Sequence, residues 1–336
     1  MDASHYTEHR PLMFSIAYRM TGSVSEAEDI VQEALLRAAK AAKAANAATV
    51  TEGGKDAESP RAYLATITTR LAIDHLRSAR VRRESYVGTW LPEPLLAGKL
   101  LADDSPGPAE RAEMSDSLSM AFLVLLESLS PAERAVFLLR EVFGYGYDEI
   151  AQAISKTEPA CRQIFARARR RIDEGRPRFD TSRAEGEELT ELFLSVAGGG
   201  DMTALLERLA PDVLFYGDSG GLGETTFIAP VLGRDQVAGL VRAQIDRTVQ
   251  LGASLHGAWV NGQPGILARD ADGGLIAVIV LDVLDGQVQA IRAVANPEKL
   301  RHICPVSRTW HLRWREQNSG EQYSAGGVTP GRPAAS

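Results

Sequence analysis

The sequence lacks the features that mark secreted, membrane and zinc-stabilised proteins. Its two cysteines, Cys161 and Cys304, suit a reducing compartment and are too few for a structural zinc site. No apolar run approaches the roughly 20 residues that span a bilayer. The first residues have no basic stretch followed by an apolar core, as a secretion signal would. We therefore expect a cytoplasmic protein with no membrane partner, no metal and no cofactor.

Basic residues are in deficit overall, which argues at first sight against a nucleic-acid partner. Acidic residues outnumber them 44 to 37, for a net charge of -7. The deficit is uneven, because residues 61–83 hold six arginines and one acid, and residues 161–171 hold five arginines and no acid. Acids dominate only after Arg183. For DNA binding the local footprint matters more than the total.

The chain is long enough for two or three domains. Residues 1–83 are expected to form a first helical domain, since apolar residues recur at three- and four-residue steps around Ile30. Ser23 and Glu26 could form a capping box for that helix. An alanine- and glycine-rich insert at residues 39–58 is expected to be partly mobile. Ser59-Pro60 then supplies an N-cap and a first-turn proline for the next helix.

The middle of the chain predicts a linker and a second helical domain. Residues 84–114 are interpreted as linker, because Pro92 and Pro94 cannot lie inside a helix. Residues 115–180 contain a short helix from Tyr147, a turn at residues 155–157 and a longer helix that buries one stripe. Two helices joined by a three-residue turn are typical of a helix-turn-helix.

The last third changes to an α+β pattern at residues 183–303. Helices are expected at residues 202–209 and 234–249. Four strand-like runs follow, separated by Asn261-Gly262, Asp272-Gly273-Gly274 and Asp285-Gly286. This spacing predicts a meandering antiparallel sheet. Residues 304–336 are rich in glycine, proline and serine and are expected to be a disordered tail.

The second helix of the predicted helix-turn-helix offers the strongest chemical signal. Its candidate DNA-binding side chains are Arg162, Gln163, Arg167, Arg169, Arg170 and Arg171. Arginine and glutamine hydrogen-bond base edges when a helix lies in the major groove. Arg169 and Arg171 are better suited to neutralise phosphates. The alternative interpretation is an ordinary basic surface helix.

Two other helix faces are candidates. The outward face around Ile30 carries Asp29, Gln32, Glu33 and Leu36, which suits a protein partner better than DNA. The helix from residue 61 supplies the remaining DNA-binding candidates: Arg61, Arg70, Asp74, Arg77 and Arg80. Basic residues near an aromatic such as Tyr63 suit melted DNA. A plain solvated face remains the alternative for both helices.

Several short motifs along the chain indicate that these helix faces belong to one kind of protein. Residues 22–34 resemble the sigma-factor segment that docks on the clamp of the largest RNA polymerase subunit. Residues 59–64 and 70–77 look like the segment that reads the -10 element. Residues 129–134, 147–151 and 162–169 resemble the domain that reads the -35 element. The resemblance implies an extracytoplasmic-function sigma factor that binds core polymerase and promoter DNA.

One subfamily, the SigJ-like factors with a SnoaL-like extension, resembles the chain more closely. Its linker signature is present as Trp90, Leu91, Pro92, Glu93 and Pro94. Its terminal signature is present, with one conservative departure, as Asn296, Pro297, Glu298, Lys299 and Leu300. Its glycine loop is matched by Asp218, Gly220 and Gly221, although the usual lysine is replaced by Leu222. The resemblance implies that these segments make interdomain contacts, and that the last domain is a cone-shaped α+β barrel.

The chemistry of the last domain is left open by the residues. Some SnoaL-like proteins are enzymes, and Asp218, Asp246, Asp282 and His256 are the polar candidates here. No catalytic constellation can be assembled from them, so a non-enzymatic factor is expected. A small ligand in this domain, read by a single-component DNA-binding regulator, is the alternative. Such a regulator would not need the polymerase-docking motif.

Overall fold

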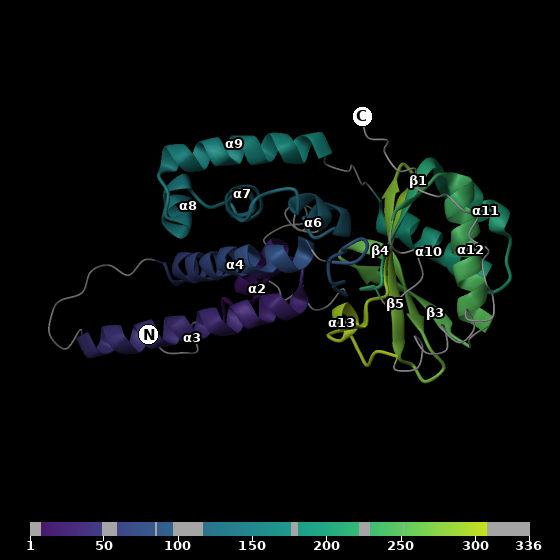
Figure 1. Cartoon of the computed structure of the whole chain (residues 1–336), viewed down its shortest axis with the longest axis horizontal. Helices are drawn as coiled ribbons and strands as arrows, with labels where there is room; N and C mark the ends of the chain where they lie inside the picture. Colours follow the sequence, from purple (N-terminus) through teal and green to yellow (C-terminus); the bar gives the residue numbers. More distant parts are fainter. Residues whose placement is uncertain are drawn as a thin grey trace, which may run out of the picture.

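A computed structural model describes residues 8–48, 59–84, 86–96, 117–175, 181–221, 229–250 and 252–307. Two helical domains lie side by side at one end of the long axis, and an α+β domain lies at the other (Figure 1). No helix in the described ranges is long and apolar enough to cross a bilayer.

The N-terminal domain consists of α2 (Arg10–Thr21), α3 (Val24–Ala48) and α4 (Pro60–Glu84). Helix α2 ends at Gly22, whose φ of 68° suits glycine. Residues 49–58 of the predicted insert lie outside the described residues. Its first part is helical, because α3 continues through Ala48. Its alanine-rich sequence has a high helix propensity, which extends the helix beyond the packed stripe.

The helix-turn-helix domain contains α6 (Met120–Leu126), α7 (Pro131–Phe137), a π-helical turn η1 (Leu138–Val142), α8 (Tyr147–Ile154) and α9 (Glu158–Gly175). Ser130 and Glu133 form a capping box at the start of α7. Ser155 takes a left-handed conformation and ends α8. Helix α9 buries Cys161, Ile164, Ala168 and Ile172, the stripe that its periodicity predicts.

These two helical domains share one hydrophobic core. It joins Tyr18 and Leu64 of the N-terminal domain to Phe137 and Ile150 of the helix-turn-helix domain. Helix α4 packs against both α7 and α8. The buried Arg134 of α7 donates to the carbonyl of Met20 at 2.6 Å. The two domains are therefore one packed body in this structure.

The C-terminal domain begins with α10 (Arg183–Ala197) and α11 (Met202–Arg208). It continues through β1 (Leu209–Asp218), β2 (Val231–Leu232), α12 (Arg234–Gln250), β3 (Ser254–Val260), β4 (Gln263–Arg269), β5 (Leu275–Leu284), β6 (Gln287–Val294) and α13 (Pro297–Leu300). The strand order is β2-β1-β6-β5-β4-β3. Strands β3 to β6 form the predicted meander. These four strands are antiparallel, as expected. Strand β1, which the sequence analysis did not predict, adds a parallel pairing with β6.

The two faces of this sheet have different neighbours. Helices α10 and α12 cover one face and enclose an apolar core that includes Phe193, Phe215 and Val241. The opposite face packs against Leu91 of the linker, Met120 of α6 and Leu300 of α13. Figure 1 shows this second face turned toward the helical domains. The sheet therefore holds the linker and the helix-turn-helix domain on its outer side.

The C-terminal domain extends past the predicted boundary at residue 303. Leu275 N donates to Pro305 O at 2.9 Å, and Ser307 N donates to Leu275 O at 3.0 Å. These bonds add a short bridge beside β5. Residues 308–336, most of the predicted tail, lie outside the described residues, as do residues 97–114 of the predicted linker.

Candidate functional site

The outward face of α3 is open to solvent. Asp29, Gln32, Glu33 and Leu36 are all exposed, and half of the Leu36 surface is accessible. Only Glu33 has a described ion pair among them, with Arg37 at 2.7 Å on the same helix. The face combines acids, an amide and an uncovered leucine, so it can accept a protein surface with basic and apolar groups.

The DNA-binding candidates on α4 are not equally available. Arg61 is exposed, and Asp74 pairs with Arg77 at 3.4 Å on the surface. Arg70 instead reaches across to the C-terminal end of α8. There its guanidinium donates to the carbonyls of Ala153, at 2.9 Å, and Gln152, at 2.5 Å. The Arg80 side chain lies outside the described residues.

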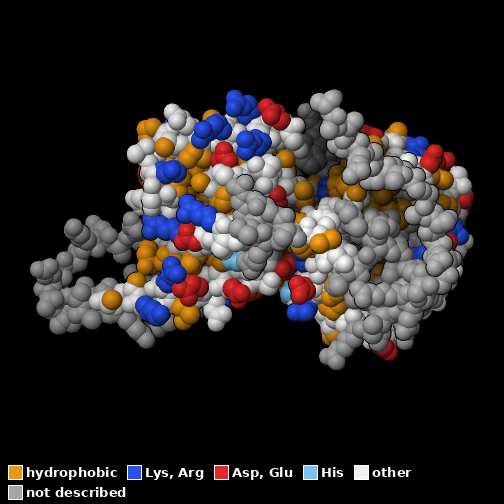
Figure 2. All heavy atoms as spheres, in the orientation of Figure 1, with side chains coloured by type: hydrophobic (Ala, Val, Ile, Leu, Met, Phe, Trp, Pro, Cys, Tyr) orange, Lys and Arg blue, Asp and Glu red, His pale blue; other side chains and the backbone are white. Residues whose placement is uncertain are grey.

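The recognition face of α9 is exposed along its length. Its exposed candidates are Arg162, Gln163, Arg167, Arg169, Arg170 and Arg171. Figure 2 shows Lys and Arg side chains gathered over the part of the surface where α9 lies. Arg162 is held by Glu158 at 2.8 Å and stacks over the Tyr147 ring, 4.9 Å from its centroid.

Arg171 also has a structural contact within its own domain. It donates to Ser128 O at 3.2 Å and lies 3.7 Å from the Glu133 carboxylate. Although burial raises the pKa of Glu133, hydrogen bonds from Ser130 and the charges of Arg171 and Arg167 keep that pKa below its ordinary value.

The predicted interdomain segments meet at one place, here called the junction, where residues 86–96 cross the C-terminal domain and the start of α3. At its centre the carboxylate of Asp218 is fully buried. It accepts hydrogen bonds from Leu91 N at 2.8 Å, from Lys299 Nζ at 2.6 Å, and from the Tyr86 hydroxyl. Lys299 also donates to Leu91 O and stacks over the Trp90 ring, 4.4 Å from its centroid. The buried ion pair thus anchors the linker.

Glu93 connects the linker to α3. Its Oε2 accepts from Val24 N at 2.8 Å and from Ser25 N at 3.2 Å, and its Oε1 accepts from the Ser23 hydroxyl at 2.6 Å. The predicted capping box is half right, because the Ser23 hydroxyl accepts from Glu26 N while Glu26 pairs with His75. A linker carboxylate therefore completes the N-terminal cap of α3, the helix whose outward face carries Asp29, Gln32, Glu33 and Leu36, here called the acidic face.

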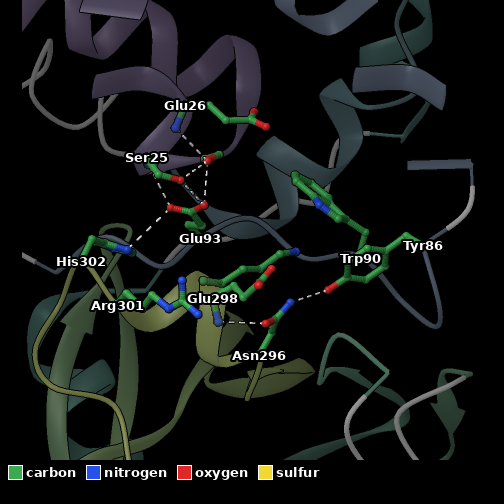
Figure 3. Close-up of a pocket in the computed structure, with 11 residues that line it drawn as sticks. Ser25, Glu26, Tyr86, Trp90, Glu93, Asn296, Glu298, Arg301 and His302 are labelled. Atoms are coloured by element: carbon green, nitrogen blue, oxygen red, sulfur yellow. Dashed lines mark hydrogen bonds and ion pairs between the residues drawn. The ribbon is translucent and has the colours of Figure 1, made fainter. Parts of the chain in front are cut away.

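A cavity of about 660 Å³ opens between these groups. Figure 3 shows its lining, which joins Ser25 and Glu26 of α3, Tyr86 and Trp90 of the linker, and the segment from Asn296 to His302. His302 bridges the last two parts, with Nε2 2.8 Å from Pro94 O and Nδ1 3.6 Å from the Glu93 carboxylate. Most residues that line the cavity carry polar or charged groups, and the cavity lies between α3, the linker and the segment that includes α13.

Close backbone approaches explain the small residues at the junction. A Cβ on Gly220, where φ is 63°, would lie 2.6 Å from Asn296 Nδ2. A Cβ on Gly221 would meet Val87 at 3.3 Å. Gly22 lies against the Trp90 ring, which a Cβ would approach to 2.7 Å. Pro92 also borders Gly22, while Pro297 begins α13 behind its N-cap Asn296. Bulkier residues would separate the surfaces.

Several residues that the sequence analysis missed are central here. Tyr18 donates to Glu93 O at 2.7 Å, and Asn261 and Gln263 bind segments from other domains. The Asn-Gly turn was the only visible signal, and it was interpreted as an ordinary hairpin. Tyr86 and Arg134 also make interdomain bonds. Tyr86 lies in no motif, and the 129–134 motif that ends at Arg134 does not indicate its partner.

The four polar candidates of the C-terminal domain do not come together. Asp218 faces the linker, and Asp282 pairs with Arg292 at 2.9 Å and binds Gln263 at 2.7 Å on the outer face of the sheet. Asp246 pairs with Arg242 on the exposed side of α12, and His256 contacts Ser254 on the edge strand β3. Across the described ranges, no cluster of three His, Cys, Asp or Glu residues could hold a metal ion.

Comparisons with known proteins agree with the order of these elements. Residues 5–82 match the family model of Sigma-70 region 2, and residues 119–172 match that of Sigma-70, region 4. The ECF RNA polymerase sigma factor SigJ of Mycobacterium tuberculosis is 35% identical over 333 residues, which cover 93% of this chain and 100% of that protein. A probable ECF RNA polymerase sigma factor SigI from the same species is 32% identical over 87% of this chain and 92% of its own.

A solved structure extends the likeness through the C-terminal domain. The crystal structure of the Mycobacterium tuberculosis extracytoplasmic-function sigma factor SigJ superposes with a TM-score of 0.65 at 32% identity. The match covers 89% of this chain and 98% of that one. Both proteins therefore have a first helical sigma region, a second one that contains the helix-turn-helix, and an α+β domain with a six-stranded sheet, in that order. The chain belongs to the extracytoplasmic-function RNA polymerase sigma factors.

Proposed function

We propose that this sigma factor uses three separate helix faces to start transcription at specific promoters. The acidic face of α3 would dock on the clamp of the largest polymerase subunit, α4 would read the -10 element, and α9 would read the -35 element. The observation that supports this assignment is that the candidate faces of α3 and α9 are both exposed. They lie in the two sigma regions, which follow one another in the order typical of the family. A single-component regulator would not need both sigma regions.

Core-polymerase binding tests the α3 assignment. Asp29→Arg reverses the charge of an exposed residue, so it should weaken binding while changing stability by no more than about 0.5 kcal/mol. Lys40→Ala, an exposed change further along α3, is the matched control. Run-off transcription with purified core polymerase should follow the same order. A folded Asp29→Arg protein with unchanged affinity would contradict the docking surface.

The compact arrangement of the helical domains supports a regulatory role for the C-terminal domain. The -10 and -35 elements lie about 25 base pairs apart, or about 85 Å at roughly 3.4 Å per base pair. Helix α8 packs between α4 and α9 (Figure 1). Packed helix axes lie about 8–10 Å apart, so α4 and α9 are separated by roughly 20 Å there. The two reading helices must move apart to reach both elements, and Arg70 must leave α8.

The linker is the part through which the C-terminal domain would control this movement. Asp218 and Lys299 bind Leu91, while Glu93 caps α3, so the linker is fixed at both sides. Trp90→Ala, and separately a stop before Asn296, should each change transcription with purified core polymerase and no other protein. Identical output from both variants and the full-length protein would remove the case for an intramolecular regulator.

We further propose a cytoplasmic, non-enzymatic factor. An apolar core lies between the sheet and helices α10 and α12, and the four polar candidates of the domain lie apart from one another. A small ligand, if one contributes the signal, would suit the junction cavity better, because that cavity touches α3, the linker and α13 together. Addition of such a ligand should then change the accessibility of Trp90, which fluorescence quenching would measure.

A further inference from the structure

The turn between β3 and β4 occupies an unusual position for a hairpin. Asn261 and Gly262 both have positive φ, at 53° and 75°, as a tight two-residue turn requires. Hairpin turns ordinarily face solvent, and the comparable Asp285-Gly286 turn between β5 and β6 exposes Asp285. Asn261 is only 1% exposed. It lies where both helical domains and the linker meet.

The side chain of Asn261 binds all three of those parts. Its Nδ2 donates to the Tyr18 hydroxyl of the N-terminal domain at 2.7 Å. The same nitrogen donates at 2.9 Å to Leu118 O, in the segment leading into α6. Its Oδ1 accepts from Leu95 N of the linker at 2.8 Å. Both amide hydrogens and the carbonyl oxygen are therefore used outside the C-terminal domain.

Backbone and neighbouring bonds hold the turn in place. Asn261 N donates to Leu95 O at 2.8 Å, which completes a two-way pairing with the linker. Gln263 Oε1 accepts from Met120 N, at the start of α6, at 2.9 Å. The other end of Gln263 binds Asp282, which is paired with the buried Arg292. The turn is thus rigidly attached to the sheet, so it can resist movement of the domains that it binds.

We propose that Asn261 is the latch residue that keeps the N-terminal and helix-turn-helix domains together in the compact arrangement. The inference rests on the proposed regulatory role of the C-terminal domain. Tyr18 and Leu118 belong to the two bodies that must separate, and both bind the same amide group. Separation leaves at least one of these buried partners without its hydrogen bond, which favours the compact state. Asn261 is a positioning residue that touches neither DNA nor polymerase in this role.

Two substitutions of Asn261 distinguish the effect of the turn's backbone conformation from the effect of the side-chain hydrogen bonds. Asn261→Gly keeps the left-handed turn, since glycine adopts positive φ freely, and removes all three side-chain hydrogen bonds. Asn261→Asp keeps the size and the acceptor toward Leu95, but sets a carboxylate oxygen against Leu118 O. Asp285→Gly is the matched control, because it changes an exposed residue of the same backbone conformation in the same domain.

Opening is measured on the full-length chain without polymerase. Fluorophores attached at Lys40 of α3 and Glu174 of α9, both exposed, report the separation of the two helical domains by energy transfer. We expect each Asn261 variant to raise the ratio of open to compact molecules about tenfold, and Asp285→Gly to leave it unchanged. An unchanged ratio in both Asn261 variants overturns the proposal. An equal rise in Asp285→Gly overturns it too, because the effect would then be general destabilisation.

A double-mutant cycle covers the case in which Asn261→Gly loses its fold. Tyr18→Phe removes only the hydroxyl that accepts from Asn261 and donates to Glu93 O. Combined with Asn261→Asp, its effect on the open-to-compact ratio should be less than the product of the single effects. Independent effects would contradict the latch. A separate experiment tests the proposed function itself. If the wild-type protein supported no run-off transcription with core polymerase, the proposed function would be wrong, regardless of the domain separation measured by energy transfer.

Discussion

Glu93 caps the helix that begins at Val24, although 69 residues separate them in the sequence: the carboxylate Oε2 lies 2.8 Å from Val24 N. A carboxylate at a helix N-terminus satisfies free amide groups and interacts favourably with the helix dipole. The linker thereby stabilises the first turn of α3, whose next turns carry the acidic face.

Replacement of this cap should destabilise the protein measurably. Glu93→Ala leaves the first amides of α3 without their acceptor, and we expect a loss of about 1–2 kcal/mol in unfolding free energy. Urea unfolding followed by far-ultraviolet circular dichroism would measure it. Glu298→Ala changes an exposed carboxylate on the same cavity and serves as control. Equal stability of the two variants would contradict the capping role.

The Lys299–Asp218 pair should be strongly coupled, because both groups are buried. Lys299→Met leaves the Asp218 carboxylate uncompensated and should cost about 3–5 kcal/mol, whereas the double variant Lys299→Met, Asp218→Asn should cost less than the sum of its parts. A double-mutant cycle on unfolding free energies gives the coupling. Additive losses would show that each group acts through other neighbours, such as Trp90 or Tyr86.

The junction should weaken in alkali because of Tyr86. Burial and the adjacent Asp218 carboxylate raise the pKa of the Tyr86 hydroxyl above its ordinary value of 10.0. A raised pKa means that the stabilisation is complete below the unfolded-state pKa and is lost as pH rises toward the folded-state value. The advantage of wild type over Tyr86→Phe should therefore be constant up to about pH 9 and shrink above about pH 10. Urea midpoints followed by tryptophan fluorescence would test this, and a constant difference through about pH 11 would refute it.

Periodicity in the sequence was sufficient to predict most elements. Strands β3 to β6 begin and end within two residues of the strand-like runs expected at 255–260, 265–269, 275–284 and 288–294, and α12 matches the expected helix at 234–249 within one residue. Strand β1 was missed because Pro211 and Asp212 interrupt its apolar pattern, although it pairs with β6 through the C-terminal part of its length. Local patterns record which face of an element is buried, so they also predicted the outward faces of α3 and α9.

The contacts between domains could not be predicted in the same way. Asn261 and Tyr18 lie 243 residues apart, and only the tertiary fold brings them within hydrogen-bond distance. Arg70 was predicted as a DNA-binding residue, but periodicity does not reveal that its guanidinium reaches the carbonyl groups of α8. Long-range partners depend on the assembled surfaces rather than on local spacing.

The last prediction separates base reading from phosphate binding on α9. Arg162 is pre-positioned by Glu158 and the Tyr147 ring, so its fork can meet a base edge at little entropic cost. Arg162→Ala should relax discrimination at one position of the upstream element by about 1–3 kcal/mol. Arg171→Ala should weaken binding to all sequences and reduce the salt slope by about one unit.

Binding of single-base promoter variants by the polymerase holoenzyme, over a salt titration, distinguishes the two arginines. Arg171 also holds Ser128 and Glu133, so the unfolding midpoint of Arg171→Ala must be measured to separate lost DNA contact from lost domain stability. Only a lost phosphate contact changes the salt slope, since counterion release depends on the number of neutralised phosphates. Equal losses on every promoter variant for Arg162→Ala would reassign that residue to the phosphate backbone.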